Sequence, residues 1–208
     1  MTSRRPPSGR RERGKEEKRR RISTAAQELF ARHGVGGVTT QQIADRADIA
    51  VGTLFLYASS KAELLIMVQN EKFAAAIDEG LAAAAGLGTA GSLDRVLALV
   101  GPVVVCIREQ PENGRAYLHE LVFGDPAEPH RGEGLALSLR LEDGLTRLLV
   151  HDRASDDAAT IARVITSVIH VTTAATVHLN DSTPVILGRV HRQISVVVPP
   201  EGRCRTPE

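Results

Sequence analysis

Residues 39–64 read Thr-Thr-Gln-Gln-Ile-Ala-Asp-Arg-Ala-Asp-Ile-Ala-Val-Gly-Thr-Leu-Phe-Leu-Tyr-Ala-Ser-Ser-Lys-Ala-Glu-Leu. This stretch fits two short helices joined by a tight turn, with a third helix beginning directly behind them. Thr39 and Gln42 have the spacing of a capping box, which opens the first helix. Residues 51–57 form the second helix, and another capping-box spacing begins at Ser60. This order predicts a helix-turn-helix, whose second helix enters the DNA major groove.

An amphipathic helix precedes this stretch. We expect it to run from Lys15 to His33 and to end at Gly34, a residue that suits a left-handed C-cap. Its apolar residues follow helical spacing at Ile22, Ala25, Ala26, Leu29 and Phe30. Three helices then close one small core, which is marginal alone and depends on the helix that follows.

Residues 21–65 resemble the DNA-binding domain of the TetR family of bacterial transcriptional repressors. About 45 of the 208 residues carry this resemblance. The matching positions are Ile22, Ala25, Ala26, Leu29, Phe30, Gly34, Thr39, Thr40, Ile43, Ala44, Ala47, Ile49, Ala50, Gly52, Thr53, Leu54, Phe55, Tyr57, Lys61, Leu64 and Leu65.

The resemblance implies an all-α protein with a helix-turn-helix domain over residues 15–60. A helical ligand-binding and dimerisation domain is expected over residues 61–198. Residues 1–14 are expected to be a disordered basic arm, and residues 199–208 a disordered tail. The implied function is that of a cytoplasmic homodimeric repressor, released from a double-stranded DNA operator by a small-molecule inducer of unknown identity.

The resemblance also implies which residues contact DNA. They are Thr40, Gln41, Val51, Gly52, Thr53, Leu56, Tyr57 and Lys61, with Tyr57 and Lys61 as phosphate contacts. Gly52 either lets the recognition helix approach DNA closely or marks a frayed first turn. Leu56 either meets a thymine methyl group or anchors the helix against its neighbour.

The charge is distributed unevenly along the chain. Residues 1–61 hold 13 Lys and Arg against 6 Asp and Glu, a net of +7, so the whole-chain net of +1 leaves −6 for residues 62–208. A basic head on an acidic body suits phosphate binding by the head alone. The arm either follows the DNA backbone or minor groove, or is a solvated tail. No apolar run follows the arm, so we expect neither a signal peptide nor a membrane partner.

The C-terminal body reads as helices throughout, and its last two helices have the clearest apolar faces. We expect these helices over residues 156–179 and 183–198. They resemble the family's dimer-forming pair, with interface residues Ile165, Ile169, Ile186, Val190 and Ile194. The alternative is that these residues only complete the core of one subunit.

A ligand cavity is implied inside the body. The candidate lining residues are Val103, Ile107, Tyr117, His170 and Thr173. Other polar residues weighed for this role are Arg115, His119 and His178, and each polar candidate is alternatively a surface or satisfied core group. The chain has 4 Phe, 2 Tyr and no Trp, so we expect an aliphatic or weakly polar ligand instead of a stacked aromatic one.

Two other classes of protein compete with this interpretation. An enzyme would need a phosphate loop, a nucleophile elbow or a paired carboxylate or Cys/His motif, and none is found in the sequence. We therefore expect no catalytic residue, no cofactor and no metal site. A helical adaptor binding RNA or a membrane surface would lack aromatic stacking residues near the arm. Cys106 and Cys204 are the only cysteines, and an inert buried thiol at Cys106 is favoured over a redox sensor.

Overall fold

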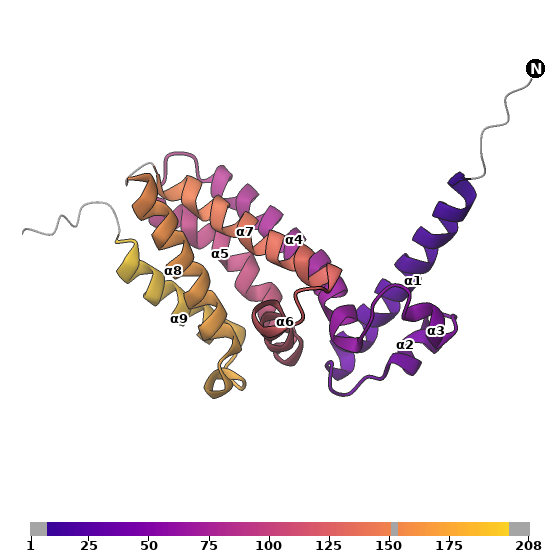
Figure 1. The fold of residues 1–208 in the computed structure, drawn as a ribbon. Helices are drawn as coiled ribbons and strands as arrows, with labels where there is room; N and C mark the ends of the chain where they lie inside the picture. Colours follow the sequence, from indigo (N-terminus) through magenta and orange to yellow (C-terminus); the bar gives the residue numbers. More distant parts are fainter. Residues whose placement is uncertain (1–7, 151–153, 200–208) are drawn as a thin grey trace, which may run out of the picture.

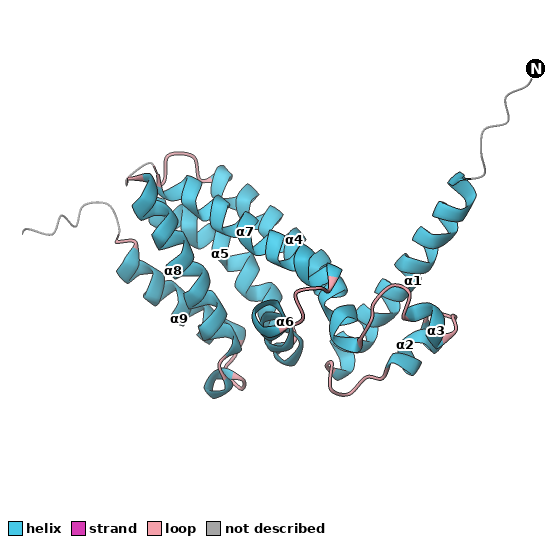
Figure 2. Cartoon of the chain, in the orientation of Figure 1, coloured by secondary structure: helices cyan, strands magenta, loops and turns pink. Residues whose placement is uncertain are grey.

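A computed structural model describes residues 8–150 and 154–199 (Figure 1). All regular secondary structure among these residues is helical (Figure 2). The elements in chain order are α1 (Ser8–His33), α2 (Thr40–Arg46), α3 (Val51–Leu54), α4 (Lys61–Gly86), α5 (Ser92–Arg108), α6 (Pro111–Phe123), α7 (Pro129–Leu149), α8 (Ser155–Ala174), the short 3-10 helix η1 (Thr176–His178) and α9 (Thr183–Val197). None of the described helices combines the length and apolar character needed to cross a membrane.

Helix α1 is longer than predicted. It begins at Ser8 instead of Lys15, so the prediction of disorder is wrong for residues 8–14. Extending a helix that is already nucleated adds one hydrogen bond for each residue fixed, and the Arg and Glu residues here are good helix formers. The added turns project away from the rest of the head (Figure 1). The first part of the predicted arm, residues 1–7, and most of the predicted tail, residues 200–208, lie outside the described residues.

Helix α3 is shorter than predicted, because it ends at Leu54 and not at Tyr57. The next residues continue as tight turns, in which the N–H of Tyr57 donates to the Leu54 carbonyl at 2.9 Å. Two local features weaken this helix. Ala50 offers no side-chain cap at its start, and Gly52 is a poor helix former within it.

The chain buries two apolar clusters, one in the head and one in the body, and α4 belongs to both. Leu64, Leu65, Met67 and Val68 of α4 pack into the head cluster. Farther along the same helix, Phe73 and Ile77 pack into the body cluster. A single rigid element therefore joins the two parts.

Helices α4 and α5 approach each other very closely. A Cβ atom placed on Gly80 would stand 2.3 Å from the Leu99 carbonyl oxygen, so only glycine fits at this crossing. Around this pair the body places α6, α7, α8 and α9 (Figure 1). Helix α5 is central, with Val96, Val100, Val103 and Val104 fully buried along it.

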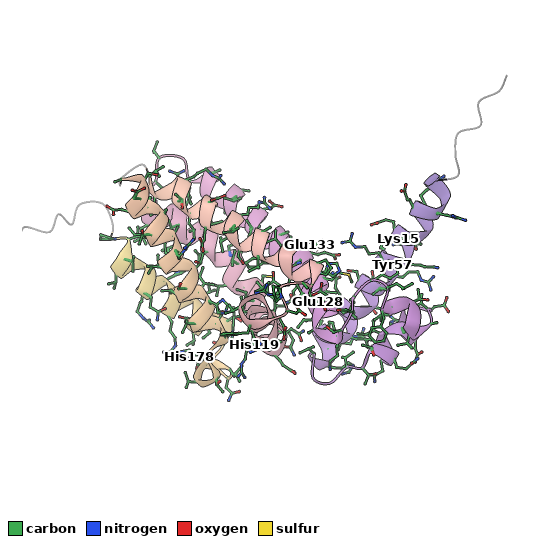
Figure 3. All side chains as sticks on the ribbon, in the orientation of Figure 1. Lys15, Tyr57, His119, Glu128, Glu133 and His178 are labelled. Atoms are coloured by element: carbon green, nitrogen blue, oxygen red, sulfur yellow. The ribbon has the colours of Figure 1, made fainter. Side chains whose placement is uncertain are left out.

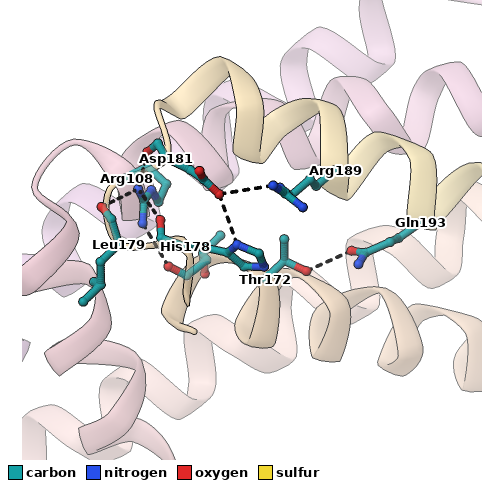
Figure 4. Close-up of polar contacts among 8 residues, drawn as sticks. Arg108, Thr172, His178, Leu179, Asp181, Arg189 and Gln193 are labelled. Atoms are coloured by element: carbon teal, nitrogen blue, oxygen red, sulfur yellow. Dashed lines mark hydrogen bonds and ion pairs between the residues drawn. The ribbon is translucent and has the colours of Figure 1, made fainter. Parts of the chain in front are cut away.

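A buried arginine shapes the corner between α8 and α9 (Figure 4). The Arg108 guanidinium at the end of α5 donates to the Thr173 carbonyl at 3.3 Å and to the Asp181 carbonyl at 2.7 Å. It also reaches the carbonyls of His178 at 3.2 Å and Leu179 at 3.3 Å. These carbonyls turn towards α5, so α8 ends at Ala174, earlier than the predicted residue 179.

Candidate DNA-binding head and ligand cavity

The first helix of the motif begins as predicted. The backbone N–H of Gln42 donates to Thr39 Oγ1 at 3.2 Å, and the N–H of Thr39 donates to Gln42 Oε1 at 2.8 Å. The capping box is therefore confirmed. It fixes the start of α2, where Thr40 is partly exposed and Gln41 is exposed. The Gln41 side-chain amide donates to Asp45 Oδ1 at 2.7 Å, one turn along the same exposed face.

The turn between α2 and α3 is held from α1. Asp48 has a φ of 51°, a left-handed conformation that Asp tolerates better than most residues. The Arg21 guanidinium donates to the Asp48 carbonyl at 2.6 Å, to Asp48 Oδ2 at 2.9 Å and also to the Ala47 carbonyl. Sequence reasoning missed Arg21, because it stands in a run of basic residues without a distinguishing pattern.

Helix α3 presents its exposed residues to solvent with no covering element. Gly52 is exposed, and a Cβ atom added there would meet nothing within 4 Å. Val51 and Thr53 are partly exposed, whereas Leu54 is buried in the head cluster. Leu56 is 81% exposed, so the interpretation of this residue as an anchor against a neighbouring helix is wrong. The surface is consistent with the expected base contacts.

Tyr57 lies beside the projecting part of α1 (Figure 3). Its hydroxyl donates to the Lys15 carbonyl at 3.2 Å, which joins the end of the recognition segment to α1. The side chain is half-buried. Its predicted phosphate contact stays a prediction, and the hydroxyl oxygen keeps its capacity to accept.

The position of Lys61 differs from the expectation. Its ammonium group donates to the Val35 carbonyl at 2.8 Å and to the Val38 carbonyl at 3.0 Å. These bonds occupy two of its three N–H donors inside the head. Lys61 therefore fastens the loop between α1 and α2 to the start of α4, and its predicted phosphate contact stays a prediction for the third N–H donor.

The same loop is also fastened to α6. The buried Asn113 amide donates to the Phe30 carbonyl at 2.8 Å, and its oxygen accepts the Val35 N–H at 2.7 Å. Next to it, Glu112 Oε1 accepts the Gly36 N–H at 2.8 Å. The first turn of α6 therefore contacts the head directly, a connection that the sequence did not suggest.

The body contains a cavity of about 340 Å³ between α4, α5, α6, α7 and α8. This volume lies within the usual range for small-molecule sites. Three predicted ligand residues line it, Val103, Ile107 and His170. Most of the remaining wall is aliphatic, and the polar residues that sequence reasoning missed are Ser138, Glu142, Thr166 and Ser167. No signal could have identified them, because polar positions on amphipathic helices look like a solvent face.

Electrostatics differ between the two sides of the cavity. Burial lowers the pKa of the His170 imidazole below its ordinary value, so the ring is neutral at pH 7. A neutral imidazole offers one donor and one acceptor. Glu142 Oε1 accepts from the Thr166 hydroxyl at 3.1 Å, and Glu142 Oε2 accepts from the exposed Arg163 at 3.3 Å. No Lys or Arg is among the described residues that line the cavity.

Two predicted ligand residues do not line the cavity. The Tyr117 hydroxyl donates to Asn70 Oδ1 at 2.9 Å, and its ring stands edge-on to Phe73 with centroids 5.7 Å apart. The Thr173 hydroxyl donates back to the Ile169 carbonyl at 2.7 Å. Both side chains are satisfied core groups. Arg115 and His119 are exposed, and His178 Nδ1 lies 3.1 Å from Asp181 Oδ2, so these residues also lie outside the cavity lining.

The predicted dimer residues face inward. They are all buried within one subunit, at Ile165, Ile169, Ile186, Val190 and Ile194. The prediction identified the apolar stripes of α8 and α9 correctly but assigned them to the wrong side, because the strongest stripe of a helix packs on its own core. The outer surface of the same helices carries exposed valines instead, at Val164, Val171, Val185 and Val196.

Comparisons with known proteins agree with this arrangement. The family model for bacterial regulatory proteins of the tetR family matches residues 22–68, which cover the helix-turn-helix and the start of α4. The chain is 29% identical over 152 residues to the HTH-type transcriptional repressor KstR of Mycobacterium tuberculosis, covering 73% of this chain and 67% of that protein.

Solved structures share the fold. The TetR-family repressor FadR of Thermus thermophilus, in complex with lauroyl-CoA, superposes with a TM-score of 0.70 at 20% identity, covering 91% of this chain and 97% of that chain. FadR of Bacillus subtilis, in complex with stearoyl-CoA, superposes with a TM-score of 0.61 at 16% identity, covering 86% and 97%. The exposed recognition segment, the family match over it and the similarity to repressor relatives identify residues 22–68 of this chain as a DNA-binding domain of the tetR family of bacterial regulatory proteins.

Proposed function

We propose that this regulator is a repressor that binds operator DNA as a homodimer and leaves it when a small aliphatic molecule enters the body cavity. The observation that carries this proposal is the pairing of an exposed recognition segment with a cavity in the body through shared helices. Helix α4 runs through both clusters, and α6 lines the cavity while its first turn holds the head. If the helices have a DNA-binding arrangement and a second one, a ligand that binds the second more tightly lowers the population of the DNA-binding arrangement.

The DNA contacts are proposed from exposure and charge. The exposed or partly exposed candidates lie on α2, on α3 and in the turn that follows α3, at Thr40, Gln41, Gly52, Thr53 and Leu56. Backbone contacts by the basic head release counterions, so affinity falls steeply with salt. Binding to duplex DNA from the gene's own promoter, compared with random duplex at several salt concentrations, tests this function. Equal affinity for both duplexes would contradict sequence-specific repression.

The dimer is proposed on the outer surface of α8 and α9. A shallow apolar groove there is lined by Arg163, Val164, Ser167, Val168, Val171, Thr172 and Gln193. A second copy fits this surface best, because a two-fold regulator places two recognition segments on two half-sites about one helical repeat apart. Light scattering tests it, with Val171→Asp expected to give monomer and Asp157→Asn, an exposed control at the start of α8, expected to remain dimeric.

The cavity walls define the ligand chemistry. The aliphatic walls favour an apolar body, and neutral His170 supports a hydroxyl or carbonyl group next to it. Glu142 disfavours a free carboxylate there, because two like charges would meet without a lining cation. The acyl-CoA ligands of the FadR structures combine an uncharged acyl chain with a charged carrier, and only the chain would have to enter this cavity.

A binding series distinguishes these chemistries. Dodecanol and lauroyl-CoA are expected to raise the unfolding temperature more than dodecanoic acid at equal concentration. Glu142→Gln is expected to improve binding of the acid, with Glu79→Gln as an exposed control outside the cavity lining. Tight binding of the acid by the unchanged protein would contradict this ligand class but would leave DNA recognition untouched.

A further inference from the structure

His130 occupies the junction where the end of the recognition segment meets α4 and α7. It is the second residue of α7 and only 9% exposed. Its Nδ1 lies 2.9 Å from Glu133 Oε2, and its Nε2 lies 3.1 Å from the Tyr57 carbonyl oxygen. Figure 3 shows Tyr57, Glu128 and Glu133 at this junction.

Both partners of the ring accept hydrogen bonds. A peptide carbonyl has no hydrogen to give, and neither has an ionised carboxylate. A neutral imidazole carries one N–H, so it can satisfy only one of these two contacts. Both contacts form together only when one more proton is bound, shared between Nδ1 and Glu133 Oε2 while Nε2–H donates to Tyr57. The observed pair of contacts therefore requires a proton between His130 Nδ1 and Glu133 Oε2.

The backbone of the same residue connects to the cavity side of the body. The His130 N–H donates to Glu63 Oε1 at 2.5 Å, and the His130 carbonyl accepts from the Asn70 amide at 2.8 Å. Asn70 in turn accepts from the Tyr117 hydroxyl, and Tyr117 packs on Phe73, a cavity-lining residue. A continuous chain of contacts thus runs from the cavity wall to Tyr57.

We propose that His130 is a proton-dependent latch, which ties the end of the recognition segment to α7 when its ring is doubly protonated and loosens that tie when the ring is neutral. His130 is a positioning residue in this scheme, because it acts on DNA through Tyr57. A second contact from α7 supports the same junction, since the Ser59 hydroxyl donates to Glu128 Oε1.

Several ionisable residues surround the ring. Glu63 approaches from α4, Glu133 from α7 and Glu128 from the residue that precedes α7. The charged residues of α1 that line the same cleft are Glu12, Lys15, Glu16 and Arg19. Five carboxyl groups and two cations therefore surround the junction.

Glu63 changes the pH dependence of stability in the same direction as His130. Its Oε2 is buried and has no hydrogen-bond partner among the described residues, and burial raises the pKa of its carboxyl. A raised folded-state pKa means that the stabilising proton is held at low pH and lost as the pH rises. Histidine changes charge within the physiological range. The two ring contacts together need one more proton than a neutral imidazole supplies, so the latch weakens as the pH increases.

Glu133→Gln isolates this proton. The glutamine amide can donate to a neutral Nδ1, so both ring contacts persist without the added proton. We expect the unfolding temperature of the unchanged protein to fall from pH 6 to pH 8, and this fall to be clearly smaller in Glu133→Gln. His119→Gln removes an exposed histidine of α6 and is expected to keep the full pH dependence. A Glu133→Gln variant with the full pH dependence would overturn the proposal.

Ring protonation gives an independent readout. The ¹⁵N chemical shifts of His130 are expected to report two protonated nitrogens at pH 6, and a protonated Nε2 beside a bare Nδ1 at pH 8. In Glu133→Gln the second pattern is expected at both pH values. A bare Nδ1 at pH 6 in the unchanged protein would overturn the latch even if every variant folded poorly.

The effect on DNA rests on the proposed function. Operator affinity at fixed ionic strength is expected to change between pH 6 and pH 8 by severalfold in the unchanged protein and less in Glu133→Gln. If the ring titrates as expected but no operator preference exists, the latch holds and the repressor proposal fails. If operator preference exists with the same pH dependence in both proteins, the repressor proposal holds and the latch fails.

Discussion

The head and the body hold their helices together by different means. In the head, short helices and loops are joined by polar contacts that cross between elements, from Arg21 to the motif's turn, from Lys61 to the preceding loop and from Asn113 to the end of α1. In the body, long helices meet through aliphatic side chains such as Leu99, Leu145 and Ile165. These polar contacts, each with a defined geometry, fix the loops of the head around its own apolar cluster.

The strongest test of apolar packing in the body is a charge inside it. Val190→Asp places a carboxylate at a fully buried position, and it is expected to lower the free energy of unfolding by about 4 kcal/mol or more. Urea denaturation measures this change. Val177→Asp, at an 82% exposed position in η1 and outside the proposed dimer surface, is the control and is expected to stay within about 0.5 kcal/mol. Similar losses for both variants would mean that burial of Val190 does not contribute to stability.

Arg108 is an exception within the body, because its guanidinium makes polar contacts inside a mostly apolar region. Arg108→Met leaves four carbonyls without their donor, and we expect a loss of about 3 kcal/mol in unfolding free energy. The unfolding temperature would fall by roughly 6–12 °C. Arg115→Met on the exposed side of α6 is the matched control. A loss no larger than the control's would show that the corner between α8 and α9 forms without this arginine.

Lys61 tests the polar contacts of the head. Lys61→Met removes both loop contacts, and we expect unfolding free energy to fall by about 1–2 kcal/mol. The salt dependence of DNA binding is expected to stay unchanged, because the ammonium is engaged inside the head. DNA affinity of both proteins, measured at several salt concentrations, tests whether the salt dependence changes. A salt-dependence slope smaller by about 1 would show that this residue also contacts a phosphate.

The smallest change in stability is expected at the DNA-facing surface. Leu56→Ala should change unfolding free energy by less than about 0.5 kcal/mol, because the side chain is already exposed. It should weaken operator binding more than random-duplex binding in a competition assay. Leu54→Ala, two residues away and fully buried, is the opposite control and should cost about 2–5 kcal/mol. Equal weakening of binding to operator and random duplexes would show that Leu56 does not contribute to base recognition.

Sequence reasoning succeeded where local chemistry decides the structure. The capping box at Thr39 and the apolar stripe from Ile22 to Phe30 need only neighbouring residues, and both are present. It failed where partners are distant in sequence. Lys61 is engaged by carbonyls more than twenty residues away, and the inner stripe of α9 reads the same whether it faces a core or a second subunit.

The cavity was predictable only in part for the same reason. Val103 and Ile107 stood out because α5 is apolar on nearly all sides. Glu142 and Thr166 look like ordinary surface residues until α7 and α8 are placed side by side. Tyr117 looked like a ligand contact because it is aromatic and polar, but its partner Asn70 lies 47 residues earlier in the chain.

The close approach of Gly80 to Leu99 gives α4 a fixed pivot near its far end. From Gly80 to Lys61 the helix extends about 28 Å, at 1.5 Å per residue. A tilt of about 5° at the pivot therefore displaces the head by roughly 2.5 Å, and two subunits would double this change in the distance between recognition segments. Helix α5 is held at the same crossing and also lines the cavity. A small change in the tilt of α4 around a ligand therefore becomes a larger displacement of the head, because the head lies far from the pivot.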